Sequence, residues 1–286
     1  MLLKPGEMFG DYRIVSLLGK GGMAEVWLLE IEARHEFCAV KILDPEKATD
    51  RTTRQRFLSE AGIAMKFVHP NIVKVYDIGE DPLTRLCYII MEYVPGGTLA
   101  DWIDAAGKIP FARAVALVRD IALLLEKAKR HGIVHRDLKP SNIMFAADGS
   151  FRIADLGTAR VNVLTDGGIS PGLTAKIGSF IGTPAYMAPE QMIDPSGVDF
   201  RADIYSLGII FYEMLTGTRP YAQLNSVQIM AKALTNERIP DVRDAEPSVP
   251  AVIANVIRIM CEPKPENRVN SPQWIADCCD RVLERS

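Results

Sequence analysis

The amino-acid sequence predicts an α+β protein with two lobes: a small antiparallel sheet carrying one main helix, and a larger, mainly helical part. Three observations lead to this prediction. Runs rich in Val, Ile, Trp and Phe, separated by turn residues, fill residues 9–94, as is typical of strands. Helical periodicity dominates residues 98–286. Between the two regions, the sequence PGG at 95–97 predicts a hinge over residues 92–97.

The first lobe is expected to contain several strands and one amphipathic helix. Strand patterns lie at 12–19 (YRIVSLLG), 20–31 (KGGMAEVWLLEI), 37–43 (FCAVKIL), 71–79 (NIVKVYDIG) and 86–94 (LCYIIMEYV). Between the third and fourth of these runs, apolar residues recur at helical spacing, which predicts a helix with one buried stripe. The stripe consists of Phe57, Ala61, Ala64, Met65 and Val68.

The second lobe opens with a long amphipathic helix over 111–132, where Gly132 marks its end. Two short strand-like pieces, NIMFA and FRIAD, flank a turn at Asp148-Gly149. A loop rich in Gly, Ser and Thr follows over 158–186, and loops of this length in a compact domain are commonly functional or disordered. Further helices are predicted at 200–216, 224–235, 249–261 and 271–284.

Composition excludes several classes of function. The 286 residues carry 33 Lys and Arg against 36 Asp and Glu, which disfavours a nucleic-acid binder with a broad basic surface. The five cysteines form no CxxC pair, so we expect reduced thiols and no zinc site. The opening residues lack the apolar core of a secretory signal, and the longest apolar run, 204–215, is too short to span a bilayer.

Two features of the first lobe have both a functional and a structural interpretation. Gly19 and Gly21, with Ala24 where a third glycine could stand, would let backbone N–H groups approach phosphate oxygens, although for this motif alone a plain turn between strands is the favoured explanation. Lys41 lies among apolar residues of a strand, where its charge requires a partner, and Glu60 on the following helix could supply one. A surface lysine remains the alternative.

The segment HRDLKPSN at 135–142 concentrates polar groups in a short loop. Asp137 and Asn142 lie within it, and Asp155 follows in IADLG. Two carboxylates and an amide oxygen are hard ligands that suit Mg²⁺ with substrate phosphates. Helix or turn capping is the alternative for each residue taken alone.

The ordered set of motifs resembles the catalytic domain of eukaryotic-type protein kinases. The glycine-rich loop, strand lysine, helix glutamate, HRDLKPSN, DLG and MAPE occur in the order of that family, over nearly the whole chain. GKGGMAEVW and GTPAYMAPEQ are similar to the bacterial serine/threonine branch. The resemblance implies a single bilobal kinase domain over 1–286, with an activation segment at about 155–190.

The resemblance also implies roles for individual residues. Asp137 would accept the proton of the substrate hydroxyl, and Lys139 would contact the γ-phosphate. Lys41, held by Glu60, would bind the α- and β-phosphates of ATP. Asn142 and Asp155 would hold Mg²⁺, with Mn²⁺ as an alternative ion. The remaining nucleotide contacts are expected from Leu18, Gly19, Lys20, Gly21, Gly22, Val26, Ala39, Met91, Glu92, Tyr93 and Val94.

Other residues acquire architectural or regulatory roles from the same resemblance. Glu190 would pair with Arg268, and Asp203 would hydrogen-bond the backbone around His135 and Arg136. Arg136 would also attract a phosphorylated residue of the activation segment, whose negative charge would balance it. The candidate residues are Thr165, Ser170, Thr174, Ser179 and Thr183, among which the sequence does not choose.

These features predict an ATP-dependent kinase of Ser and Thr hydroxyls in proteins that also phosphorylates its own activation segment, with a transient dimer as one route. No nucleic-acid or membrane contact by the chain itself is expected. The expected location is the cytoplasm, either as a free domain or as the cytosolic part of a longer, membrane-tethered protein. One alternative is a pseudokinase scaffold. The other is a kinase of small hydroxylated molecules, and the segment GTPAYMAPE, which supports a platform for peptides, disfavours this second alternative.

Overall fold

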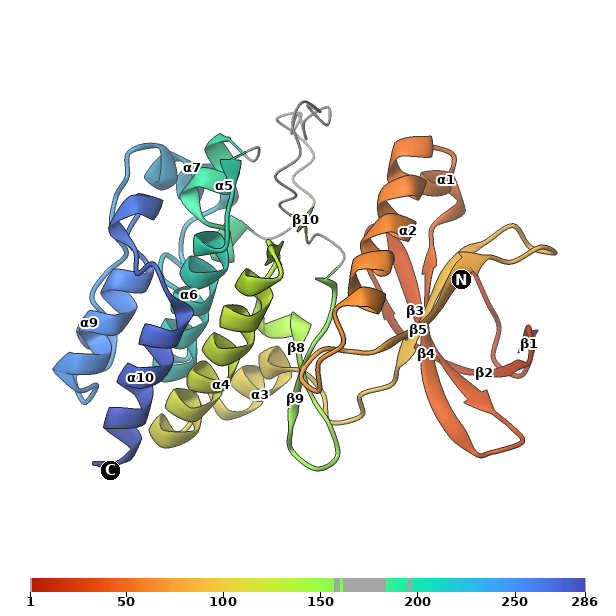
Figure 1. Cartoon of the computed structure of the whole chain (residues 1–286), viewed down its shortest axis with the longest axis horizontal. Helices are drawn as coiled ribbons and strands as arrows, with labels where there is room; N and C mark the ends of the chain where they lie inside the picture. Colours follow the sequence, from red (N-terminus) through yellow and green to blue (C-terminus); the bar gives the residue numbers. More distant parts are fainter. Residues whose placement is uncertain (1, 157–159, 162–183, 195–196, 286) are drawn as a thin grey trace. The chain divides into compact units, whose positions relative to one another are not determined.

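The computed structural model describes residues 2–156, 160–161, 184–194 and 197–285. Within these ranges the side chains of five residues are not described: Arg56, Ser59, Glu60, Arg160 and Val161. The chain divides into two compact units (Figure 1). The first unit comprises Met1–Gly97 and Met144–Thr158, and the second comprises Thr98–Ile143 and Ala159–Ser286.

The first unit is built on a six-stranded antiparallel sheet, as the strand patterns predicted. The strand order in the sheet is β1-β2-β3-β4-β6-β5. It follows the order along the chain, except that β6 lies between β4 and β5. In this register Val26 lies opposite Lys41, and Ala39 lies opposite Met91. The strands are β1 (Met8–Phe9), β2 (Tyr12–Lys20), β3 (Ala24–Ile31), β4 (Glu36–Leu43), β5 (Val75–Glu80) and β6 (Cys87–Glu92).

The two faces of this sheet are covered by different elements (Figure 1). Side chains alternate along β3, so Trp27 and Leu29 point to one face while Ala24 points to the other. Leu3 and Phe9 from the N-terminal residues pack on the first face. Helix α2 (Arg51–Lys66) packs on the second, preceded by the short α1 (Pro45–Ala48).

The predicted stripe of α2 is only partly correct. Phe57 and Ala61 are buried in the core between the helix and the sheet. Met65 is 40% exposed, and Val68 is 78% exposed because the helix has already ended at Lys66. The apolar residues keep their helical spacing in the sequence beyond Lys66, but the helical backbone ends there.

The predicted hinge makes a close backbone contact with the β8 (Ile143–Phe145) and β9 (Phe151–Ile153) pair. The N–H of Gly96 donates to the carbonyl oxygen of Phe145 at 2.7 Å, and the N–H of Phe145 donates to the oxygen of Gly97 at 3.0 Å. A Cβ on Gly96 would lie 2.4 Å from the Phe145 oxygen. Position 96 therefore requires a glycine, because there is no space for a Cβ atom.

The second unit is mainly helical. The four predicted helices at 200–216, 224–235, 249–261 and 271–284 are confirmed within one or two residues at each end. Its elements are α3 (Leu99–Ala106), α4 (Phe111–Arg130), β7 (Ile133–Val134), β10 (Arg160–Val161), α5 (Pro189–Ile193), α6 (Arg201–Thr216), α7 (Ser226–Leu234), α8 (Val242–Ala245), α9 (Ala251–Met260) and α10 (Pro272–Leu283). Helix α6 is buried on nearly all sides and packs against α4 and α9, while α10 packs against α4.

Helix α3 was not predicted, although its start carries a clear signal. Thr98 accepts from the N–H of Asp101, and the Asp101 carboxylate accepts from the N–H of Thr98, which is a capping box. The sequence predictions placed no helix between the hinge at 92–97 and the helix at 111–132.

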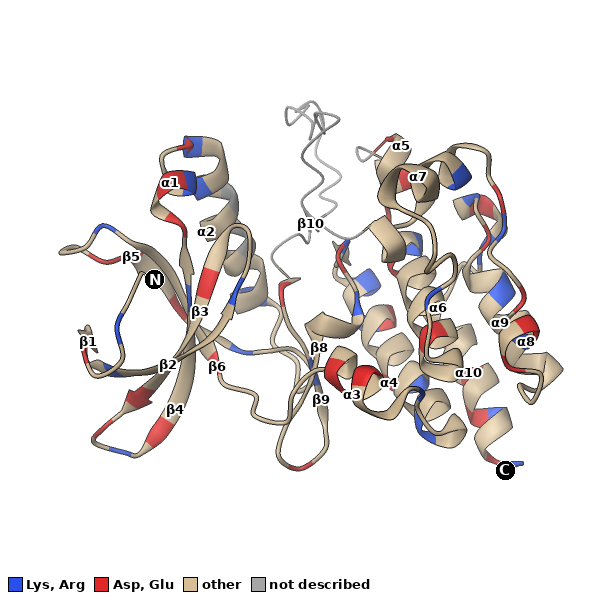
Figure 2. Cartoon of the chain, turned by 180° about the vertical axis from the view of Figure 1, so that it is seen from behind, with Lys and Arg blue, Asp and Glu red and all other residues tan. Residues whose placement is uncertain are grey.

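All five cysteines are buried and free. Figure 2 shows Lys and Arg interspersed with Asp and Glu along the helices and strands of both units. Among the described residues, no helix combines the length and the apolar character needed to cross a bilayer.

We expect Gly96→Ala to destabilise the chain, because the added methyl meets the Phe145 carbonyl and the backbone must shift; a cost of about 1–3 kcal/mol is typical of such overpacking. Gly62→Ala is the matched control, since Gly62 lies in α2 and a Cβ added there would have nothing within 4 Å. That change should stabilise the helix by roughly 0.5–1 kcal/mol. Urea unfolding of the two variants should shift in opposite directions, and equal shifts would contradict this account.

Candidate active site

The glycine-rich turn connects β2 to β3 and faces solvent. The residues from Leu18 to Gly22 are all exposed, and burial resumes at Ala24. The N–H of Gly21 donates to the carbonyl of Ala24 at 2.9 Å, which closes the turn. The turn is thus exposed to solvent and closed by a backbone hydrogen bond, which suits a phosphate-binding loop.

Lys41 lies on β4 and its charge is paired, as its position in an apolar strand requires. Its Nζ lies 2.5 Å from Oδ1 of Asp155, a residue of the same unit that follows β9. The lysine side chain is 24% exposed and the aspartate 43%, so the pair is accessible to a ligand. The backbone of Glu60 lies in α2, but its side chain is outside the described parts, so a Lys41–Glu60 pair stays a prediction.

The expected adenine-binding residues lie on adjacent strands of the first unit. Val26, Ala39 and Met91 are brought together by the registers of β3 with β4 and of β4 with β6. The Glu92 carboxylate already has two hydrogen-bond donors within the protein. It accepts from the N–H of Lys74 and from the guanidinium of Arg152, both at 3.2 Å. Any contribution of Glu92 to nucleotide binding would therefore come from its backbone.

The loop after β7 brings three of the predicted residues of the second unit into contact. Lys139 Nζ lies 2.8 Å from Asp137 Oδ2. The side-chain amide of Asn142 donates to the carbonyl oxygen of Asp137 at 2.8 Å and lies 3.3 Å from its Oδ2. The Asp137 carboxylate is 32% exposed and Asn142 is buried. A reachable carboxylate is thus held between a cation and an amide.

A buried carboxylate on α6 fixes the backbone of this loop. Asp203 accepts from the N–H of His135 at 2.7 Å and from the N–H of Arg136 at 2.8 Å, as predicted. Burial raises the pKa of the Asp203 carboxyl, and its contacts with His135 and Arg136 oppose that rise. The donors occupy both oxygens and so fix the loop immediately before Asp137.

Gln191, to which the sequence motifs gave no role, supports the same loop. Its side-chain N–H donates to the carbonyl oxygen of Arg136 at 2.8 Å, and its Oε1 accepts from the N–H of Ala188 at 3.0 Å. The signal was its place directly after the APE motif, at the third position of α5, where a side chain commonly reaches back to the helix start.

The predicted Glu190–Arg268 pair is confirmed as a bidentate contact. The two guanidinium nitrogens lie 2.5 and 2.7 Å from the two carboxylate oxygens. The Arg268 side chain is fully buried, and it also donates to the carbonyl oxygens of Glu262, Pro263 and Arg201. A buried guanidinium with this many acceptors anchors α5 to the start of α6 and to the segment before α10.

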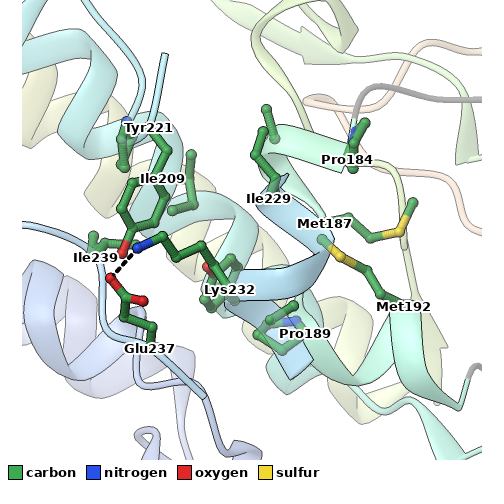
Figure 3. A pocket seen from close by; sticks show the side chains of 14 residues that line it. Pro184, Met187, Pro189, Met192, Ile209, Tyr221, Ile229, Lys232, Glu237 and Ile239 are labelled. Carbon is green, nitrogen blue, oxygen red and sulfur yellow. Dashed lines mark hydrogen bonds and ion pairs between the residues drawn. The ribbon is translucent and has the colours of Figure 1, made fainter. Parts of the chain in front are cut away.

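A pocket of the second unit lies beside this anchor, between α5, α6 and α7 (Figure 3). Met187, Pro189 and Ile229 form part of its apolar wall. Lys232 lies at its edge with Nζ 2.5 Å from Oε1 of Glu237.

The predicted metal ligands suit a divalent cation by donor chemistry. The Asn142 amide nitrogen faces Asp137, which orients the amide oxygen elsewhere, and Asp155 is an accessible carboxylate. Both supply the hard oxygen donors that Mg²⁺ prefers. Among the residues that the structure describes, no group of three or more His, Cys, Asp or Glu forms a ready-made metal cage. A site completed by substrate phosphates and water needs no such cage.

The five candidate phosphorylation residues, Thr165, Ser170, Thr174, Ser179 and Thr183, lie outside the described residues. Arg136, which was expected to attract a phosphate, donates from Nη2 to the carbonyl oxygen of Val198 at 3.1 Å.

Comparison with known proteins identifies the family. A family model described as the protein kinase domain matches residues 12–279. The chain is 38% identical over 266 residues to the serine/threonine-protein kinase PknB of Mycolicibacterium smegmatis, covering 92% of this chain and 41% of that protein. It is 35% identical to PknD of Mycobacterium tuberculosis, covering 98% of this chain and 41% of that protein. The chain thus spans about two fifths of the length of these relatives.

The structural comparison agrees. The kinase domain of PknI from Mycobacterium tuberculosis superimposes with a TM-score of 0.74 at 26% identity, covering 98% of this chain and 99% of that chain. The chain therefore belongs to the protein kinase domain family, as a Hanks-type domain similar to bacterial serine/threonine kinases. The predicted family and fold are confirmed. Membership implies the use of ATP and a divalent metal ion.

We expect Asp203→Ala to leave two buried N–H groups without their acceptor and to lower the free energy of unfolding by about 2–5 kcal/mol. The control is Asp277→Ala on α10 of the same unit, whose exposed carboxylate accepts from the side-chain amide of Gln273. Since surface substitutions of this kind usually change stability by less than about 0.5 kcal/mol, this change should be nearly neutral. Denaturant unfolding measures both, and a neutral Asp203→Ala would refute the role given to this carboxylate.

Proposed function

We propose that the chain transfers the γ-phosphoryl group of ATP to Ser and Thr hydroxyls of proteins. The observation that carries the proposal is the contact set of Asp137, Lys139 and Asn142 on one loop held by Asp203. Phosphoryl transfer depends mainly on positioning and charge neutralisation, which this set can supply. The similarity to bacterial serine/threonine kinases supports the same reaction.

In the proposed step, the hydroxyl oxygen of the acceptor attacks the γ-phosphorus and its proton passes to the Asp137 carboxylate. The bond from the γ-phosphorus to the bridging oxygen breaks, which releases ADP. Lys139, whose ammonium group lies next to that carboxylate, would neutralise charge on the transferring phosphoryl group.

In the first unit, Lys41 would bind the α- and β-phosphates, with Glu60 holding the lysine. The turn from Leu18 to Gly22 would cover the phosphates through backbone N–H groups, and Val26 with Ala39 would contact the adenine. The lysine is paired with Asp155, so ATP binding would exchange one anionic partner for another.

We assign Asn142 and Asp155 as the residues that would hold the metal ion, with Mg²⁺ preferred and Mn²⁺ able to substitute. The ion would neutralise charge on the phosphates and fix their geometry. The two residues supply oxygen donors and leave the remaining positions to phosphate and water.

The acceptors are proposed to be protein Ser and Thr, because Lys139-Pro140 follows Asp137 where tyrosine-specific members of the family usually differ. Residues of the chain's own activation segment would be among the acceptors, and two copies would meet transiently for that reaction. We place the chain in the cytoplasm, with no contact to nucleic acid or membrane of its own. A pseudokinase scaffold is the alternative, and the joint presence of Lys41, Asp137, Asn142 and Asp155 argues against it.

Asp137→Asn keeps the side-chain shape but removes the proton acceptor, so we expect phosphoryl transfer to fall by about 10²–10⁴-fold. Asp277→Asn, an exposed position on α10 of the same unit, should leave the rate unchanged. The measurement is transfer of label from [γ-³²P]ATP with Mg²⁺ to the chain and to a generic protein substrate. ATP binding without transfer in the wild type would favour the scaffold alternative.

Mass mapping of residues 158–186 in the labelled wild type tests the activation-segment proposal. We expect phosphate on Ser or Thr of that segment, and none in Asp137→Asn. A fully active wild type without phosphate in the segment would overturn self-phosphorylation as its activating step.

A further inference from the structure

Glu25 is a buried carboxylate that the proposed reaction does not use. It lies at the start of β3, just after the glycine-rich turn, and is 4% exposed. An ionised carboxylate is costly to bury unless its oxygens are hydrogen-bonded. Its neighbours at the same end of the sheet, Gly19 to Gly22, are exposed, so Glu25 is the first buried charged group beneath the turn.

Three donors from different parts of the first unit satisfy this carboxylate. Oε2 accepts from the backbone N–H of Leu2 at 2.9 Å and from the indole N–H of Trp27 at 3.1 Å. Oε1 lies 2.9 Å from Nζ of Lys20. Burial raises the pKa of the Glu25 carboxyl, but the donated hydrogen bonds outweigh this, and the net pKa lies below its ordinary value. Glu25 is thus a stable anion that collects the three groups.

The donors connect the chain's first residues to the turn. We use the term N-terminal strap for residues 2–9, which end in the edge strand β1 and place the side chains of Leu3 and Phe9 on the sheet face opposite α2. Leu3 and Phe9 of the strap are buried against Trp27, and the ring of Phe9 packs edge-on to Tyr88 at 5.4 Å. The strap therefore has a fixed position of its own from which the Leu2 N–H is directed at Glu25.

The third donor belongs to the turn itself. Lys20 lies directly opposite Glu25 in the β2–β3 register, on the other side of the Gly21–Met23 tip. The Lys20 side chain is 62% exposed, and an ion pair of that exposure contributes little by itself. The orientation of the Glu25 carboxylate is instead fixed from the buried side by Leu2 and Trp27. These two hydrogen bonds therefore also fix the position of Glu25 Oε1, the oxygen that Lys20 contacts.

We infer that Glu25 is a positioning residue for the phosphate-binding turn, and that the N-terminal strap sets its orientation through the Leu2 N–H. All residues of the turn from Leu18 to Gly22 are exposed. The position of the turn therefore depends on the contact between Lys20 and Glu25 beneath it. The inference rests on the proposed function, because it assigns the turn to ATP phosphates. Glu25 and the strap act on ATP affinity and leave the proton-transfer residues of the second unit untouched.

The test uses Leu2→Pro with Met1 retained, because a proline whose nitrogen is in a peptide bond has no N–H to donate to Glu25. Leu2→Ala is the matched control, since it removes the side chain and keeps the N–H. We expect Leu2→Pro and Glu25→Gln to raise KM for ATP by about fivefold with kcat within about twofold of wild type, a coupling of ordinary size. Leu2→Ala should remain near wild type. Equal KM values for Leu2→Pro and Leu2→Ala, or a loss confined to kcat, would overturn the inference.

A second measurement separates this inference from the proposed function. Amide hydrogen exchange of residues 16–24 without nucleotide should be faster in Leu2→Pro than in Leu2→Ala, and the ¹H–¹⁵N indole signal of Trp27 should shift while those of Trp102 and Trp274 do not. These readouts need no catalysis. A wild type without phosphoryl transfer would reject the proposed function, whereas unchanged exchange in Leu2→Pro would reject the coupling by itself.

Discussion

The hydrogen bonds from the loop backbone to Asp203 are the constraint on which the candidate catalytic loop depends. Arg136 adopts φ +69°, a conformation uncommon for residues other than glycine. Such backbone persists only where its surroundings hold it. Asp203 holds the N–H of Arg136, Gln191 holds its carbonyl, and its guanidinium donates to Val198. The next residue is Asp137, so the geometry of the proposed base follows from this restraint.

Buried charged side chains restrain the backbone elsewhere in the chain as well. Arg268 joins α5 to the start of α6 through Glu190, and Glu25 joins the N-terminal strap to the glycine-rich turn. Each ion has several hydrogen-bond partners, without which its burial would be unfavourable. Each also connects segments that are distant in sequence. By contrast, exposed pairs such as Arg243–Asp241 connect neighbours and restrain little.

Most of the strands, the longer helices other than α3 and the need for a partner at Lys41 could be predicted from local sequence, since periodicity and burial cost act locally. The Asp155 partner could not, because it lies 114 residues away and depends on tertiary folding. Glu190–Arg268 and the Asp203 contacts were predicted only through family resemblance. Glu25 was missed because a charged residue beside an exposed turn looks like surface. Its carboxylate accepts from the Leu2 N–H, which lies 23 residues earlier in the sequence, and no local pattern connects the two residues.

The central claim is that this chain moves a phosphoryl group from ATP to a hydroxyl. The most direct test is ³¹P NMR of the wild type with Mg²⁺, ATP and a serine-containing protein substrate. We predict that a phosphoserine signal grows in step with ADP. ADP accompanied only by inorganic phosphate would mean that water is the acceptor, and an unchanged ATP spectrum would mean that the chain binds without transfer. Either result would contradict the account.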